Sequence, residues 1–132
     1  MLPYHIYMIK HIIIKTKKHK EVIDITNLVN ENLSIKEGPC HIFALHTTTA
    51  VTTSDLDPGT DLDLLDAFIN MVPKLPYRHP HNPAHAPDHI LSSLVKSSLT
   101  LPVENGKLVL GMWQRVVLIE FDGPRDREIV VY

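Results

Sequence analysis

The chain has a single cysteine, Cys40, among its 132 residues. One thiol cannot form a disulfide within the chain, so the sequence is not that of a small secreted domain held together by disulfides. Because Cys40 lies in an apolar run, we expect a small buried hydrophobic residue rather than a nucleophile. The fold therefore has to be stabilised by an ordinary hydrophobic core.

Positive charge is not in excess either. The chain has 13 Lys and Arg against 15 Asp and Glu, a formal net charge of −2, which gives no basic field for nucleic acid. The apolar stretch 6–14 is interrupted by Lys10 and His11 and is too short to span a membrane. No small-residue cleavage site follows it. We therefore expect a cytoplasmic protein without nucleic-acid or membrane partners.

The size and composition are those of one globular domain, which we assign to residues 1–132. The predicted strands are 4–16, 22–25, 40–46, 47–53, 99–103, 107–110, 111–121 and 128–132, and the predicted helices run over about 26–35, 60–72 and 87–97. The strands are grouped rather than alternating with helices. This pattern favours an α+β fold, a two-layer sandwich with a mostly antiparallel β-sheet and helices packed on one face.

Histidine is abundant, with nine residues in the chain. Five of them fall at the end of a predicted strand or in the Pro/His-rich stretch further on, at His46, His79, His81, His85 and His89. Five prolines between positions 73 and 87 stiffen this stretch, which holds side chains in place at little entropic cost. A functional cluster is favoured over an exposed loop, although His46 alone fits a core histidine equally well.

His85 and His89 have the i, i+4 spacing of a zinc-binding pair on a helix. Pro87, however, favours the first helical position, which puts His85 before the helix, so the two imidazoles can converge only from a loop and a helix. A zinc site needs three or four ligands, and neutral imidazole is the commonest. Candidate further ligands or their supporting carboxylates are Asp55, Asp57 and Asp88.

Three residues near the C-terminus with polar or aromatic side chains are considered as site residues: Trp113, Gln114 and Arg125. Trp113 is the only tryptophan, and composition favours a place in the core. Gln114 beside it can bind a polar substrate group. Arg125 follows a Gly-Pro turn, where a solvated arginine is favoured over an anion contact.

Several motifs follow one another in a fixed order from about Tyr4 to Tyr132. They are His46-Thr47-Thr48-Thr49-Ala50, Asp57-Pro58, Tyr77-Arg78-His79, the helix around His89 that leads into 98–103, Leu110-Gly111-Met112-Trp113-Gln114 and Glu120-Phe121-Asp122-Gly123-Pro124-Arg125. In these motifs the chain resembles the YjbQ-like family, often labelled secondary thiamine-phosphate synthase.

The resemblance implies a compact α+β fold and a homotrimer with pockets near the subunit interfaces. It also implies that His46, His79 and His89 are the site histidines, both as catalytic groups and as ligands of a divalent metal, with zinc expected. The residues expected to bind substrate are Arg78, Trp113, Gln114 and Asp55, and Lys96 is a further candidate phosphate contact. The chain departs from the family pattern at Asp55, His85 and Arg115, where relatives usually carry glutamate, asparagine and glycine.

The expected function is that of a small metal-binding enzyme with a His-lined pocket and a small phosphorylated substrate. The family label implies thiamine-phosphate synthase activity, which joins a pyrimidine diphosphate to a thiazole phosphate. The chain lacks a Gly-rich phosphate loop and an evident acidic cradle for magnesium, and imidazole-rich sites suit zinc and hydrolysis. The alternatives are a metal-dependent hydrolase of a phosphate or acyl substrate and a non-catalytic trimer that binds a metal or a small molecule.

Overall fold

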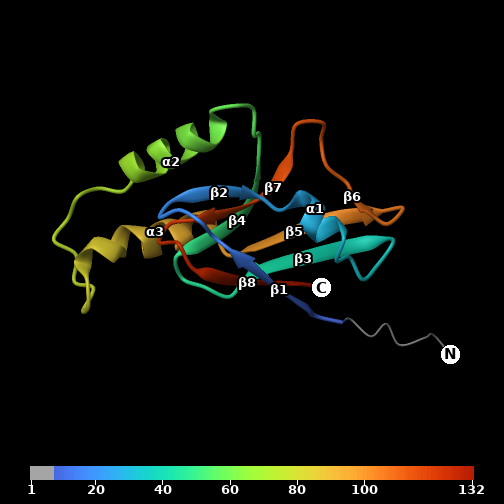
Figure 1. Cartoon of the computed structure of the whole chain (residues 1–132), viewed down its shortest axis with the longest axis horizontal. Helices are drawn as coiled ribbons and strands as arrows, with labels where there is room; N and C mark the ends of the chain where they lie inside the picture. The colour runs from blue at the N-terminus through green and yellow to red at the C-terminus, as the bar shows by residue number, and fades with distance from the viewer. Residues whose placement is uncertain (1–7) are drawn as a thin grey trace.

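A computed structural model of the chain describes residues 8–132 (Figure 1). The elements are β1 (Lys10–Lys15), β2 (Glu21–Asp24), α1 (Thr26–Asn30), β3 (Gly38–Ala44), β4 (Thr49–Ser54), α2 (Thr60–Met71), the 3₁₀ turn η1 (Pro83–His85), α3 (Ala86–Val95), β5 (Ser98–Glu104), β6 (Lys107–Leu108), β7 (Arg115–Glu120) and β8 (Asp126–Val131). Within residues 8–132, no helix combines the length and the apolar character needed to cross a bilayer.

The strands form two antiparallel sheets. One has five strands in the order β1-β8-β3-β5-β6, and the other has three in the order β2-β7-β4. Buried side chains from both sheets, among them Ile42 of β3, Val116 of β7 and Ile129 of β8, belong to one core cluster. Since burying one such side chain contributes about 1.5–3 kcal/mol, this shared core is the main force that holds the sheets together.

Helices α2 and α3 lie over the other face of the three-stranded sheet (Figure 1). Leu65 of α2 and Leu91 of α3 pack there against Val117 and Ile119 of β7. The hydroxyl of Ser92 donates to the carbonyl of Thr49 at 2.6 Å, which ties α3 directly to β4. Strand β7 is thus covered on both faces. Because both faces are buried, its sequence is an almost continuous apolar run.

The α+β class, the antiparallel strands and the helices on one face are confirmed. The strands divide between two sheets, so the layers are sheet, sheet and helices. Asn105 and Gly106, both with positive φ, form the expected hairpin turn between β5 and β6. Positions 4–7 of the predicted first strand lie outside the described residues.

Of two residues expected in the core, Cys40 is buried and Trp113 is not. Cys40 is buried, and this burial raises the pKa of its thiol to about 11, which leaves it unreactive. Trp113 is 68% exposed on the connection that precedes β7, so the expectation of a core tryptophan is wrong. The predicted strand 111–121 begins only at Arg115, because the residues before it form an exposed turn.

The turn between β7 and β8 packs closely against the segment that follows β1. A Cβ atom at Gly123 would lie 2.4 Å from the carbonyl oxygen of Lys18 and 2.9 Å from Oγ1 of Thr16. The Gly123 N–H also donates to the carbonyl of His19 at 2.8 Å. Only glycine fits there without moving the backbone of one of the two segments.

Replacing Gly123 by alanine should therefore lower the free energy of unfolding by about 1–3 kcal/mol, the usual cost of overpacking. Urea denaturation monitored by circular dichroism measures the change. Gly111→Ala is the matched control, since its Cβ would meet only the movable side chain of Gln114, at 3.2 Å. Equal stability of wild type and Gly123→Ala would contradict the close packing of this turn.

Candidate functional site

A cavity of about 370 Å³ lies where the β3–β4 connection, the start of α3 and the β7–β8 turn meet. It is lined by Leu45, His46, Thr47, Thr48, His85, His89, Asp122, Arg125 and Arg127. We call this cavity the His/Arg pocket. Its walls come from three separate stretches of chain, and eight of the nine lining residues carry an imidazole, a guanidinium, a hydroxyl or a carboxylate.

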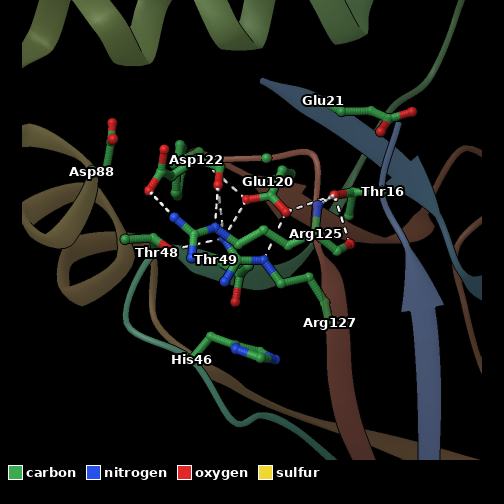
Figure 2. A network of polar contacts seen from close by, with 12 residues as sticks. Thr16, Glu21, His46, Thr48, Thr49, Asp88, Glu120, Asp122, Arg125 and Arg127 are labelled. Carbon is green, nitrogen blue, oxygen red and sulfur yellow. Dashed lines mark hydrogen bonds and ion pairs between the residues drawn. The ribbon is translucent and has the colours of Figure 1, made fainter. Parts of the chain in front are cut away.

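A buried ion pair supports the floor of the pocket. The guanidinium of Arg127, which is 3% exposed, donates through Nε and Nη2 to the carboxylate of Glu120, which is fully buried. Figure 2 shows this carboxylate between Arg127 on one side and Thr16 on the other, with the Thr16 hydroxyl 2.9 Å from it. The backbone N–H of Asp122 also donates to the Glu120 carboxylate, at 2.9 Å. The buried charges are therefore matched by hydrogen bonds.

The charge state of Glu120 follows from these contacts. Burial by itself would raise the pKa of this carboxyl group. The hydrogen bonds from Arg127, from the Asp122 N–H and from Thr16, together with the charge of Arg127, outweigh burial and lower the pKa below 4.5. Glu120 is thus an anion at neutral pH.

The two guanidinium groups are only partly used by the protein. Arg127 also donates through Nη2 to Oγ1 of Thr48 at 2.8 Å. Among residues 8–132, its hydrogen bonds use Nε and Nη2, which leaves Nη1 for a ligand. Arg125 likewise uses Nε and Nη2, on the carbonyl and carboxylate of Asp122. The Thr48 hydroxyl accepts from Arg127 and keeps its own proton free to donate.

His46 is held as a neutral imidazole with a defined tautomer. The backbone N–H of Glu128 donates to His46 Nε2 at 2.7 Å, so Nε2 is unprotonated and Nδ1 carries the hydrogen. Burial, followed by the positive charge of Arg127, lowers the pKa of His46 below 6.5. His46, which lines the pocket, therefore keeps Nδ1–H as its remaining hydrogen-bond donor.

His89 has the complementary arrangement. Its Nδ1 lies 3.0 Å from the carbonyl oxygen of Thr47, an acceptor, so Nδ1 carries the hydrogen and Nε2 is the free lone pair. His79 packs flat on His89, with ring centroids 4.8 Å apart and an interplanar angle of 14°. His85 lies 6.5 Å from His79 by the same measure and 3.7 Å, Nδ1 to Oδ2, from Asp122. The structure thus gathers four histidines at one end of the molecule.

Four other predicted residues lie elsewhere in the chain. Asp55, Trp113 and Arg115 line a separate cavity of about 200 Å³, and Gln114 is next to them. In the β4–β7 register, Ser54 pairs with Arg115 and Thr49 with Glu120. The two cavities are therefore at opposite ends of this strand pair, about 16 Å apart along the strands.

Two further candidates contribute nothing to the His/Arg pocket within one chain. Arg78 and Lys96 are exposed, and neither lines it. Arg125, expected to be a solvated turn arginine, is about half exposed but does line the pocket, where it pairs with Asp122.

The three histidines expected to hold zinc do not present a zinc site in this arrangement. Nε2 of His46 already accepts a backbone N–H. The rings of His79 and His89 are nearly parallel, so their in-plane lone pairs run side by side rather than toward one point. Over residues 8–132, no three His, Cys, Asp or Glu side chains are grouped to hold a metal ion. Of the three histidines expected to hold zinc, His89 is the one with the pattern of a ligand, with Nδ1 on a carbonyl and Nε2 without a hydrogen bond among residues 8–132.

Sequence reasoning missed Glu120 and Arg127, the pair on which the pocket is built. Glu120 follows the apolar residues 116–119, and Arg127 comes two residues before the apolar residues 129–131. A charged residue that points into a buried strand needs a partner, and this was the signal available from the sequence. It did not identify which partner each charge would find.

Removing the charge of Glu120 tests the role of this pair. Glu120→Gln leaves a buried guanidinium without its counter-ion, which should lower the free energy of unfolding by about 3–5 kcal/mol. Urea denaturation measures the loss. Glu128→Gln is the control, because its carboxylate is 36% exposed and pairs with the exposed His11, a kind of contact that contributes little to stability. A loss for Glu120→Gln no larger than that of the control would contradict the assignment.

The lowered pKa of His46 makes a pH dependence testable. In the unfolded chain His46 binds a proton from about pH 6.5 downward, whereas in the folded protein it does so only at lower pH. Protonation therefore favours unfolding as the pH falls below about 6.5. The unfolding free energy of His46→Gln should fall less between pH 7 and pH 5 than that of wild type. His81→Gln, at an exposed position, should follow wild type; parallel curves for His46→Gln and wild type would refute the shift.

Comparisons with known proteins agree with the fold. The family model described as "UPF0047 protein YjbQ-like" matches residues 10–132. A UPF0047 protein of Archaeoglobus fulgidus is 38% identical over 119 residues, which cover 89% of this chain and 94% of that protein. The UPF0047 protein YugU of Bacillus subtilis is 38% identical over 124 residues, which cover 91% of this chain and 94% of YugU.

Solved structures agree as well. A YbjQ-like protein of unknown function from Sulfolobus solfataricus superposes with a TM-score of 0.85 at 32% identity, over 94% of both chains. A hypothetical protein from Aeropyrum pernix gives a TM-score of 0.87 at 29% identity, over 96% of this chain and 97% of that one. The names of these relatives assign no activity. The matched length and these identities show that the chain belongs to the YjbQ-like family of UPF0047 proteins.

Proposed function

We propose that this chain is an enzyme that binds a small phosphorylated molecule in the His/Arg pocket and uses His89 as its general base. The observation that carries the proposal is a pair of imidazoles with different unused ring atoms, a hydrogen-bond donor on one and an acceptor on the other. His46 offers an N–H donor and His89 offers a lone pair, on two walls of one cavity. Proton transfer and charge stabilisation need these two functions side by side.

The anionic substrate is supported by the donors in the pocket. Nη1 of Arg125, Nη1 of Arg127, the Thr48 hydroxyl and Nδ1–H of His46 are donors that the protein leaves free among residues 8–132. Guanidinium groups match phosphate oxygens in geometry and charge. Because carboxylates balance both arginines, affinity would come from these directed donors rather than from a large positive field.

The roles of the two histidines differ chemically. His89 Nε2 can take a proton from an attacking water or hydroxyl group and then return it to the leaving oxygen, while the Thr47 carbonyl stabilises the imidazolium through Nδ1–H. His46 has one ring hydrogen and would become an imidazolate if it gave that hydrogen up. It would therefore act as a neutral donor to a developing negative charge, not as an acid.

Two reactions use this arrangement. In the synthase reaction implied by the family resemblance, the arginines would hold the departing pyrophosphate of the pyrimidine diphosphate. In hydrolysis, His89 would activate a water against a phosphate ester. The free Nε2 of His89 supports hydrolysis more directly, since the coupling reaction needs mainly stabilisation of the leaving group.

The assay compares both reactions in one set of proteins, purified without a His tag from a host that lacks thiamine-phosphate synthase. Thiamine phosphate formation is measured with purified pyrimidine diphosphate and thiazole phosphate, and phosphate release with a panel of phosphomonoesters. We expect His89→Asn to lower kcat by about 10²–10⁴ and His46→Ala by about 10²–10³.

The control is His81→Asn, since His81 is exposed and does not line the pocket. Its activity should equal that of wild type. Calorimetric titration with inorganic pyrophosphate tests binding separately. Binding without turnover in either assay would overturn the enzyme assignment in favour of a binding protein. Unchanged activity of folded His89→Asn would remove the general base.

The zinc prediction has its own test. To share an ion, His46 would have to give up the Glu128 N–H, and the stacked rings of His79 and His89 would have to separate. Elemental analysis of the untagged protein decides: zinc at one ion per chain, lost in His89→Ala, would support the prediction and replace the general-base role.

A homotrimer is also proposed, on the basis of exposed apolar side chains. Ile13 and Phe43 are exposed on the outer face of the five-stranded sheet, at 56% and 40%, and Ile90 and Leu94 are exposed on α3. A second copy of the chain would cover these side chains. Light scattering should give three times the 15.0 kDa chain mass, and Phe43→Glu should lower it. A monomeric wild type would refute this.

A further inference from the structure

A larger cavity lies on the other side of the first turn of α3. Its volume is about 520 Å³, within the range of small-molecule sites. The lining is mainly apolar and comes from the end of α2, the Pro-rich loop and α3, with Ile69, Val72, Leu75, Pro83, Pro87 and Leu91 among its residues. The cavity is thus framed by the stiff loop that the sequence marks with five prolines.

This cavity is distinct from the His/Arg pocket. Ala84, Asp88 and Leu91 line it, whereas His85 and His89 line the His/Arg pocket. Positions 84, 88 and 91 are spaced by four and three residues, so they share one side of the helical segment. The segment therefore forms a wall between two sites, and binding at this cavity is independent of the function proposed for the His/Arg pocket.

One polar group interrupts the apolar lining. Nζ of Lys20 donates to Asp88 Oδ1 at 2.9 Å and to the carbonyl of Phe121 at 2.7 Å. Two of its three N–H donors are thus used, and one remains. The side chain of Asp88 is 7% exposed, and only Oδ1 accepts a hydrogen bond among residues 8–132, which leaves Oδ2. A partly buried donor and a buried carboxylate therefore lie next to each other at this cavity.

We propose that this cavity binds a small, neutral, largely aromatic or aliphatic molecule that carries an amide-like group. The carbonyl of such a group would accept from Lys20, and its N–H would donate to Asp88. A charged group is disfavoured, because Lys20 and Asp88 already neutralise each other and an added charge would be buried without a counter-ion. The apolar body would gain affinity from burial against Leu75, Leu91 and their neighbours.

The probe for this test is 2-naphthamide, which has an aromatic body and a primary amide. Titration of the full ¹⁵N-labelled chain should give saturable shifts of the backbone amides of Leu75, Ala84 and Leu91. 2-Naphthoate, with a carboxylate in place of the amide, should bind at least about tenfold more weakly. An absence of saturable shifts, or equal or tighter binding of the naphthoate, would overturn the proposal.

Variants on the two sides of α3 provide the matched control. Ala84 is exposed and lines the cavity, so Ala84→Trp can fill it without disturbing the core and should weaken 2-naphthamide binding at least about tenfold. Ser93 is exposed on α3 and does not line this cavity, so Ser93→Trp should bind as wild type does. Equal affinity of wild type and Ala84→Trp would place the probe elsewhere and refute the site.

Discussion

The buried ion pair between Glu120 and Arg127 is the interaction on which the rest of the site depends. It joins the end of β7 to β8 across the turn that carries Asp122 and Arg125. Neither charge can remain buried without the other, because desolvation of a lone charge is far more costly than that of the pair. Arg127 then fixes Thr48, so the pair also holds the β3–β4 connection in place.

The histidines are positioned by backbone groups of the loops and strands around this pair. The N–H of Glu128, the residue after Arg127, sets the tautomer of His46, and the carbonyl of Thr47, the residue before Thr48, sets that of His89. Each imidazole therefore depends on a residue adjacent to the ion-pair network. Fixed backbone contacts of this kind preorganise side chains better than contacts between long, flexible groups. The hydrogen-bonding roles of the two imidazoles therefore follow from the backbone conformation around the Glu120–Arg127 pair.

Sequence patterns predicted much of the secondary structure because those patterns are local. The Asn105-Gly106 turn and the Pro87 helix start depend on neighbouring residues only. The division into two sheets does not. Strand β1 pairs with β8, more than a hundred residues away, and no local signal in either strand specifies that partner. Similarly, Trp113 lies close in sequence to Glu120, but Trp113 precedes β7 and Glu120 ends it, so the extended strand separates the two residues.

The sequence pointed to histidines of the candidate site but not to its buried ion pair. The abundance of histidine and the stiff Pro-rich stretch pointed to five histidines, from which the family resemblance selected His46, His79 and His89. The structure packs His79 on His89 and places His46 and His89 around one cavity. The ring orientations depend on backbone partners, which a sequence does not reveal. These orientations decide between a metal ligand and a proton-transfer group.

The most direct test of the account is the tautomer of His46, measured by long-range ¹H–¹⁵N correlation in protein with ¹⁵N-labelled histidine at neutral pH and assigned with His46→Gln. The account predicts a neutral ring with its hydrogen on Nδ1 and an unprotonated Nε2. A hydrogen on Nε2, or a fully protonated ring, would contradict the contact with Glu128 and the division of roles between the two histidines.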